Sequence, residues 1–349
     1  MGGDANTHLR YYGCMTKRAG LALALFSLLL ATFGCAHGRI KGDNYATHGV
    51  HNLVDCEKYP CNYATETGRP PDPIYPPYWV SPWTMYTLFG DNYVNYPPPY
   101  NGKPPAPLKE GVDYTVSFGA SYYDSTYVPT GASANPGKGA MMEHYEKRCL
   151  PIFAIDNHYT CSFISLGDVA YFVTYEDRPS WMPPVCLFSP WNHPPARDFI
   201  NHLPYSTADS QRLGIPGAQA YSMWVSAITG KPVQTGAAPV HPKEDPVILF
   251  GYAFAPVNGT MQPQSFYFSG YPFEPADAPI VTQNYMNFSA TQPDPKQTWD
   301  QVSGIDPSTL PLCQLFDPPK DVPPQGVVGA VAPVKRAPTW GDIGRWPKQ

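Results

Sequence analysis

Charged side chains are scarce in this sequence of 349 residues, because Asp, Glu, Lys and Arg together make up only 15% of it. About 25% is usual for a soluble globular protein. The formal net charge of −5 is mildly acidic, and no segment carries a long run of Lys and Arg. A protein that binds nucleic acid needs a basic face for the phosphate backbone. We therefore expect no nucleic-acid partner.

The sequence also lacks a complete catalytic or metal-binding motif. The Gly-x-Ser-x-Gly pattern of many hydrolases and the His-x-x-x-His spacing of many zinc sites are both absent. Residues 132–139 match a phosphate-binding loop only in part, because Gly139 replaces the Mg²⁺-binding Ser or Thr and Pro136 removes an N–H. Residues 167–171 match a short motif of metallophosphatases, but the further ligands of that family are missing, so a hairpin turn explains them better. We expect no metal and no cofactor.

Acidic and histidine side chains nevertheless leave one enzymatic alternative open. An exported hydrolase acting on envelope polymer would use an acid such as Glu143, Asp168 or Glu176 together with a histidine. Asp198 and His202 are four positions apart and would share one face of a helix. A cleft that gathers two or more such groups with shifted pKa values would favour the enzyme, whereas dispersed positions would favour binding.

Proline and tyrosine, by contrast, are abundant, with 44 and 25 residues in the chain. Because proline interrupts the hydrogen bonds of a helix, we expect little helix. Many of these residues fall in 57–109, which we expect to form an extended or looped Pro/Tyr-rich arm. Its rings, among them Tyr78, Trp79 and Trp83, would either stack on a sugar or polyproline partner or fill the outer core of the domain.

Residues 110–313 carry the patterns of regular structure. Alternating or continuous apolar segments predict strands, and hairpin turns are predicted between them at Asp156-Asn157-His158, Gly167-Asp168 and Asn258-Gly259. The predicted strands lie near 112–123, 149–155, 160–166, 169–176, 218–228, 247–254, 264–271 and 278–288.

Helices are expected only at 139–150 and 195–203, with a further short turn capped by Ser206. We predict a mainly β domain, an antiparallel sandwich or bent sheet with two or three short helices and long Pro-rich loops. Residues 314–349 return to Pro and Gly and are expected to form a tail.

Six cysteines remain once Cys14 and Cys35 are set aside. In an oxidising compartment an even number is typical of disulfides, although six cysteines allow 15 connectivities. Proximity in the sequence favours the first two pairs and leaves the third. The expected pairs are Cys56 with Cys61, Cys149 with Cys161, and Cys186 with Cys313.

The segment that begins at Met15 has the anatomy of an export signal. Basic residues precede an uncharged apolar run at 19–34, which is too short for a comfortable transmembrane helix. We expect residues 1–34 to be a signal peptide, with Met15 as the true start. An ordinary cleaved signal peptide, with no modification at the cut, is the alternative.

Gly34-Cys35, at the end of this run, resembles the lipobox of bacterial lipoproteins. The resemblance implies cleavage before Cys35 and acylation of that residue, followed by an anchor and tether at 35–56. Ala36 stands where Asp commonly retains such proteins in the inner membrane, so the resemblance favours the outer membrane.

Together these features predict a cell-envelope lipoprotein with a binding or assembly role at the membrane surface. Its expected partners are the membrane itself, through the lipid, and an envelope glycan or another envelope protein. Binding is favoured over catalysis because no catalytic motif is complete.

Overall fold

The computed structural model describes residues 59–89, 92–129, 139–151, 158–189, 194–226, 231–234, 247–269 and 280–313. The predicted signal peptide, the anchor at Cys35, the tether, most of the partial phosphate loop, and the tail lie outside the described residues. Within the described ranges, no helix is long and apolar enough to cross a membrane.

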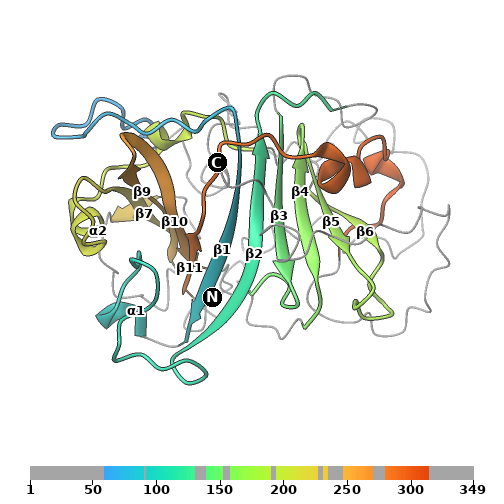
Figure 1. Cartoon of the computed structure of the whole chain (residues 1–349), viewed down its shortest axis with the longest axis horizontal. Helices are drawn as coiled ribbons and strands as arrows, with labels where there is room; N and C mark the ends of the chain where they lie inside the picture. Colours follow the sequence, from blue (N-terminus) through green and yellow to red (C-terminus); the bar gives the residue numbers. More distant parts are fainter. Residues whose placement is uncertain are drawn as a thin grey trace, which may run out of the picture.

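The strands form one eleven-stranded antiparallel sheet (Figure 1), which confirms the predicted mainly β antiparallel fold. Neighbouring strands follow the order β6-β5-β4-β3-β2-β1-β11-β10-β9-β7-β8. The strands are β1 (Tyr78–Leu88), β2 (Tyr114–Asp124), β3 (Ala140–Glu146), β4 (Cys161–Leu166), β5 (Val169–Thr174), β6 (Val185–Ser189), β7 (Gln219–Ser226), β8 (Pro232–Gln234), β9 (Val247–Val257), β10 (Thr260–Ser269) and β11 (Ile280–Tyr285).

The sheet is strongly bent. β2 and β9 are four strand spacings apart, which is roughly 19 Å across a flat sheet. The ring of Tyr75 nevertheless lies 5.7 Å from that of Tyr123 on β2 and 5.9 Å from that of Phe254 on β9. Because one ring contacts both strands, the sheet curves around Tyr75, and the face that carries Tyr123 and Phe254 is concave.

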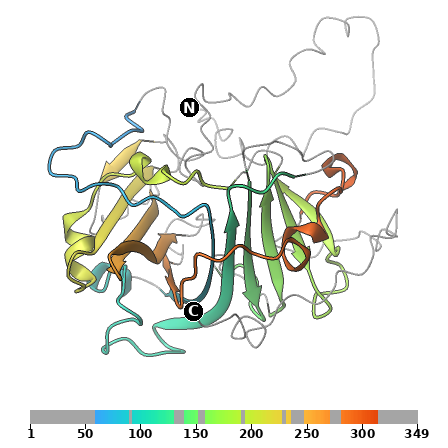
Figure 2. The ribbon, with the colours of Figure 1, turned by 45° about the horizontal axis from the view of Figure 1, so that its top comes forward.

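Segments outside the sheet cover both of its faces. Tyr75 belongs to residues 59–77, which run along the β7–β9 side of the molecule before entering β1 (Figure 2). On the convex face, the chain after β11 crosses β2 and β3 (Figure 1). There, Trp299 of η5 (Trp299–Gln301) packs into a buried cluster that includes Met142 of β3 and Ile164 of β4. A second buried cluster contains Tyr93 and Leu213. Tyr93 belongs to α1 (Asn92–Asn95), and Leu213 follows α2 (Thr207–Arg212).

The Pro/Tyr-rich arm is not the irregular segment that the sequence predicts. Its residues Tyr78–Leu88 form β1, a central strand paired with β2 and β11. Proline is tolerated there because the backbone nitrogen of Pro82, which has no hydrogen to donate, points toward β11 at the position where the β1–β11 pairing ends. The Met286 amide donates to the Pro82 carbonyl, and the next bridge, Val80 with Ser289, skips one residue.

The prediction of a helix at 139–150 is also wrong, because this segment contains β3. Met141 and Tyr145 face the concave side, whereas Met142 and His144 face the convex side, and all four are buried. A central strand with two buried faces lacks the alternation of an edge or surface strand, so its pattern imitates a helix.

The other two helical predictions differ in outcome: the segment at 195–203 is shorter than expected, and the capped turn at Ser206 is confirmed. Residues 195–203 contain only one 3₁₀ turn, η3 (Phe199–His202). The cap at Ser206 is confirmed, because its side chain accepts a hydrogen bond from the Asp209 amide at the start of α2. Further 3₁₀ turns are η4 (Pro295–Gln297) and η6 (Pro307–Thr309).

Two of the three predicted hairpin turns are present, and the third, at 156–158, lies mostly outside the described residues. Asn258 and Gly259 take positive φ values of 50° and 80° between β9 and β10, and Gly167 takes 59° between β4 and β5. The strand predicted at 149–155 is not found at 149–151, and its remaining residues lie outside the described part of the chain.

Two predicted disulfides are confirmed. Cys149 bonds to Cys161 with a Cα–Cα distance of 5.3 Å, and Cys186 bonds to Cys313 with 5.1 Å. Cys61 is also disulfide-bonded, and its predicted partner, Cys56, lies outside the described residues.

Candidate functional site

A polar network is buried on the concave face where β2, β3 and β11 bring their side chains together. Ser121 and Glu143 are cross-strand partners. The Tyr145 hydroxyl donates to Glu143 Oε2 at 2.9 Å, and Gln283 Nε2 donates to Ser121 Oγ at 3.0 Å. Gln283 also hydrogen-bonds to Glu143, and Tyr285 hydrogen-bonds to Ser121. One connected network therefore spans three strands.

Glu143 is the ionisable centre of this network. Only 7% of its surface is exposed, and among the described residues it has no ion-pair partner. Burial raises the pKa of Glu143 to about 6, although the hydrogen bonds from Tyr145 and Gln283 act in the opposite direction. At neutral pH the concave face therefore holds a buried carboxylate that has no cationic partner among the described residues.

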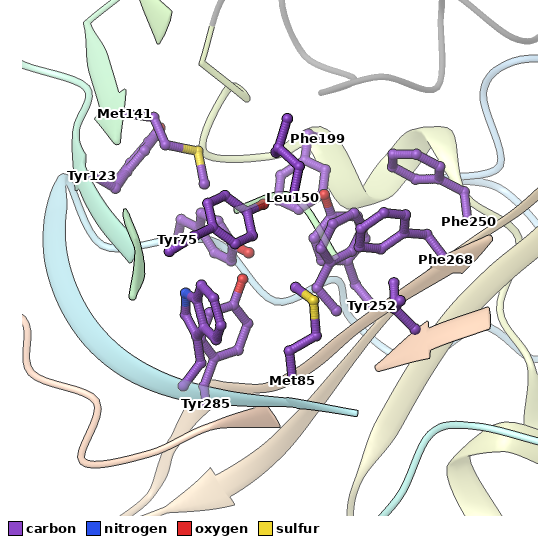
Figure 3. Packing of buried hydrophobic residues seen from close by; sticks show 14 of the residues in the cluster. Tyr75, Met85, Tyr123, Met141, Leu150, Phe199, Phe250, Tyr252, Phe268 and Tyr285 are labelled. Carbon is purple, nitrogen blue, oxygen red and sulfur yellow. The ribbon is translucent and has the colours of Figure 1, made fainter. Parts of the chain in front are cut away.

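The charge of this carboxylate acts on four buried tyrosines. Burial is the main cause that raises the pKa of Tyr75, Tyr145, Tyr252 and Tyr285, and the charge of Glu143 raises each of them further. These four rings come from the 59–77 segment, β3, β9 and β11. In Figure 3, Tyr75, Tyr252 and Tyr285 converge on one region beside Met85.

Trp83 packs beside the network because its neighbour on β2 is a glycine. Trp83 and Gly119 are cross-strand partners, and a Cβ atom at Gly119 would overlap the indole ring and the His144 carbonyl oxygen. The indole meets the ring of Tyr145 edge to face, with 5.3 Å between centroids. Gly119 thus allows an indole to occupy the floor of the concave face.

Three buried polar atoms near this floor have no hydrogen-bond partner within the described residues: Trp83 Nε1, Ser117 Oγ and Gln283 Oε1. The strand register places all three around Met85, which is opposite Ser117 on β2 and Gln283 on β11 and two residues from Trp83. A buried polar group left without a partner costs about 1–3 kcal/mol. These atoms are unused donors and acceptors around Met85 on the concave face.

Beside the polar network, the concave face carries a ladder of aromatic rings on β9 and β10. The ring of Phe266 stacks on Tyr252 at 4.6 Å and on Phe268 at 4.4 Å, and Phe250 packs against it at 5.3 Å. Phe250 and Tyr285 each keep 9% exposure, whereas Trp83 has none. This part of the concave face is therefore almost completely buried, and it has a polar half and an apolar half.

The aromatic residues predicted for exposed stacking are placed differently. Trp79 and Trp83 are fully buried in the core, so the prediction of an exposed platform is wrong for them and the alternative, rings that fill the core, is correct. Tyr78 is half-buried at the start of β1. Trp79 and Trp83 are buried because the part of the arm that carries them forms β1, a central strand of the sheet.

The acids and histidines proposed for a hydrolase are dispersed. Asp168 lies in the β4–β5 turn, and Glu176 and His158 are exposed. Glu143 and His144 are adjacent in sequence but project from opposite faces of β3. No group of three or more His, Cys, Asp or Glu side chains in the described ranges is arranged to hold a metal ion.

His144 belongs instead to a closed network on the convex face. Its Nδ1 lies 2.9 Å from Ser162 Oγ, which lies 2.7 Å from the Tyr175 hydroxyl. Burial lowers the pKa of His144 to about 4, so the ring is neutral at pH 7. The Ser162–His144 pair resembles a catalytic dyad, but both residues are buried, which closes the pair to a substrate.

The second predicted acid–histidine pair does not form a site. Asp198 is exposed, and the His202 ring lies against the Cys61 carbonyl oxygen, 2.5 Å from Nδ1. Burial lowers the pKa of His202. The contact joins η3 to the 59–77 segment and is structural.

Sequence reasoning identified Glu143 only as one acid among several and missed its partners. The usable signal was the alternation of Met141, Glu143 and Tyr145, which places the carboxylate on an apolar strand face. Gln283 and Tyr285 gave no signal, because only the strand order brings β11 next to β1. Comparisons with known protein families and with curated proteins found no match for this chain.

Proposed function

We propose that this chain is a cell-envelope lipoprotein whose β domain binds a small ligand on its concave face. The observation that supports this most is the buried carboxylate of Glu143, which accepts a hydrogen bond from Tyr145 and has no cationic partner within the described ranges. Binding sites of this kind are mostly apolar with a few converging polar groups. The concave face has that composition.

Catalysis has less support. The concave network offers a carboxylate, an amide and hydroxyls, but the residues named for a hydrolase do not converge on it. The pair that geometry alone would favour, Ser162 with His144, is buried on the convex face, where Gln301 of η5 lies 3.5 Å from the Tyr175 hydroxyl. A binding role, with the lipid on Cys35 holding the domain at the membrane, accounts for these positions.

The anchor is tested by fractionating membranes of a bacterial host that expresses the wild type or Cys35→Ser, with intact-mass measurement of each. Two or more acyl chains give stable anchoring, since each buried CH₂ contributes about 0.8 kcal/mol. We expect a membrane-bound wild type that carries acyl mass and a soluble variant without it. A soluble, unacylated wild type would contradict the proposed anchor, and the outer-membrane fraction tests the favoured location.

A further inference from the structure

We propose that the Cys186–Cys313 disulfide is a redox-sensitive clasp at the edge of the sheet. When an external dithiol reduces it, the terminal segment, residues 304–313, detaches and uncovers the edge of β6. The Cys149–Cys161 disulfide stays closed under the same conditions. The clasp is independent of the ligand-binding role proposed above.

The two disulfides differ in their access to solvent. Cys149 and Cys161 have no exposed surface, so a reductant reaches neither sulfur while the core is closed. Cys186 is equally buried, but Cys313 is partly exposed. Disulfide exchange begins when a thiolate attacks one of the two sulfurs, and its rate depends on access to that sulfur. Cys313 Sγ is therefore the point of attack.

Reduction of the clasp proceeds in two exchange steps. A thiolate of the dithiol attacks Cys313 Sγ, the bond to Cys186 Sγ breaks, and the released Cys186 thiolate takes up a proton. The second thiol of the dithiol then attacks the mixed disulfide and frees Cys313 as a thiol. Two electrons and two protons pass to the protein, and the dithiol becomes a disulfide.

The terminal segment is attached to the sheet by weak contacts apart from the disulfide. Every residue from 304 to 313 is half-buried or exposed. The bonds that shape η6 are local, since the Asp306 carboxylate accepts from the amide and the hydroxyl of Ser308. Ile305 accepts a hydrogen bond of 3.3 Å from the Tyr171 hydroxyl, and Ile305 and Leu310 are partly buried. Loss of the disulfide therefore leaves a segment that opens readily.

The terminal segment covers the edge of β6, which is an end strand of the sheet. The Leu187 amide donates to the Pro311 carbonyl oxygen at 2.8 Å, and the Cys313 amide donates to the Leu187 carbonyl oxygen at 3.0 Å. Leu187 and Leu312 thus form a parallel bridge, and the disulfide joins the residues next to them. An uncovered edge strand can pair with another chain. The redox state of the clasp therefore decides whether this edge is covered.

The opening is limited to the terminal segment because the preceding turn is anchored in the core. Trp299 and Val302 have no exposed surface. The Val302 amide donates to the Trp299 carbonyl oxygen at 3.0 Å within the turn that η5 begins. These contacts do not involve the disulfide, so η5 stays in place when the clasp opens.

The first test is thiol alkylation of the full chain, in detergent, after increasing times in dithiothreitol. Each cysteine is followed in its own peptide, so that the half-buried Cys61 is measured separately. We expect Cys186 and Cys313 to be alkylated roughly tenfold sooner than Cys149 and Cys161. Alkylation of the buried pair first, or of both pairs together, would overturn the clasp.

The second test is amide hydrogen exchange of the oxidised protein and of the partly reduced protein. We expect the Leu187 amide to exchange roughly tenfold faster or more after reduction, while the Val302 amide keeps its protection. Unchanged exchange at Leu187 would show that the edge stays covered. Equal acceleration at Leu187 and Val302 would show that the molecule opens as a whole, and either result would overturn the clasp.

Two double variants make the test specific. Cys186→Ala with Cys313→Ala should show the fast Leu187 exchange without any reductant, and dithiothreitol should not change it further. Cys149→Ala with Cys161→Ala is the matched control, which should keep the slow exchange of the oxidised wild type and respond to dithiothreitol as the wild type does. A slow Leu187 amide in the first variant would contradict the clasp and would leave the ligand-binding role undecided.

Discussion

At the scale of single residues, Glu143 and His144 show how strand geometry separates neighbours. Consecutive side chains on β3 point to opposite faces, so the carboxylate enters the concave network and the imidazole enters the convex core. Burial shifts their pKa values in opposite directions, because it disfavours the charged form of each. The two groups therefore give the protein opposing pH dependences.

His144 should destabilise the protein in acid. Its pKa of about 4 in the folded state lies below the ordinary 6.5, so the unfolded chain binds the proton first. The stabilisation is present above pH 6.5 and is lost as the pH falls toward 4, by up to about 3 kcal/mol. We expect His144→Gln to lose less stability over this range in urea unfolding. His158→Gln, which alters an exposed histidine, should match the wild type; an equal change in both variants would contradict the assignment.

Glu143 should act in the opposite sense. Its pKa of about 6 in the folded state lies above the ordinary 4.5, so its stabilisation is present below pH 4.5 and is lost as the pH rises through 6. Glu143→Gln should then be about 1–2 kcal/mol more stable than the wild type at pH 7.5 and show no such advantage at pH 4. Chemical unfolding at both pH values measures this. A variant that is less stable at pH 7.5 would show that the charge has a compensating partner.

At the scale of elements, local signals predicted the hairpins well and the central strands poorly. Asn258-Gly259 fixes a turn by its own backbone preferences, which need no partner. β1 and β3 depend on neighbours on both sides, and Pro82 and the run around Met141 suggested other structures when considered alone. A proline is compatible with a central strand here because the β1–β11 ladder ends where its N–H is missing.

Gly119 should be intolerant of any side chain, because it lies beneath Trp83 in the β1–β2 pair. A Cβ atom there would overlap backbone as well as the indole, so the strands must move. We expect Gly119→Ala to cost about 3 kcal/mol in the free energy of unfolding. Ser117→Ala, on the same strand and face, removes a hydroxyl that has no partner among the described residues and should be neutral or stabilising. Similar losses in both variants would contradict the packing described.

The Cys186–Cys313 disulfide should stabilise more than Cys149–Cys161. It ties the segment after β11 to β6, where the Leu187 amide and carbonyl also bond to Pro311 and Cys313. It spans 127 residues against 12, which in the chain-entropy model corresponds to about 5 against 3 kcal/mol. Thermal unfolding of the two double Cys→Ala variants compares them. A larger loss for the shorter loop would contradict this ranking.

At the scale of the whole molecule, the site exists because a long sheet is bent. The fold class and two disulfides could be predicted from composition, alternation and cysteine spacing. The concave site could not, because Tyr75, Glu143, Tyr252 and Gln283 are distant in sequence and meet only through strand order and curvature. Neither feature is encoded in a local pattern.

The central claim is that this concave face is a ligand site rather than a filled core. The most direct measurement is a crystal structure at pH 7.5 of the protein purified from a bacterial host without added ligand. We predict ordered density of a small co-purified molecule beside the Glu143 carboxylate. A concave face that is filled by side chains, or in which ordered waters alone satisfy Trp83, Ser117 and Gln283, would show that the buried carboxylate is structural and that the protein binds its partner through another surface.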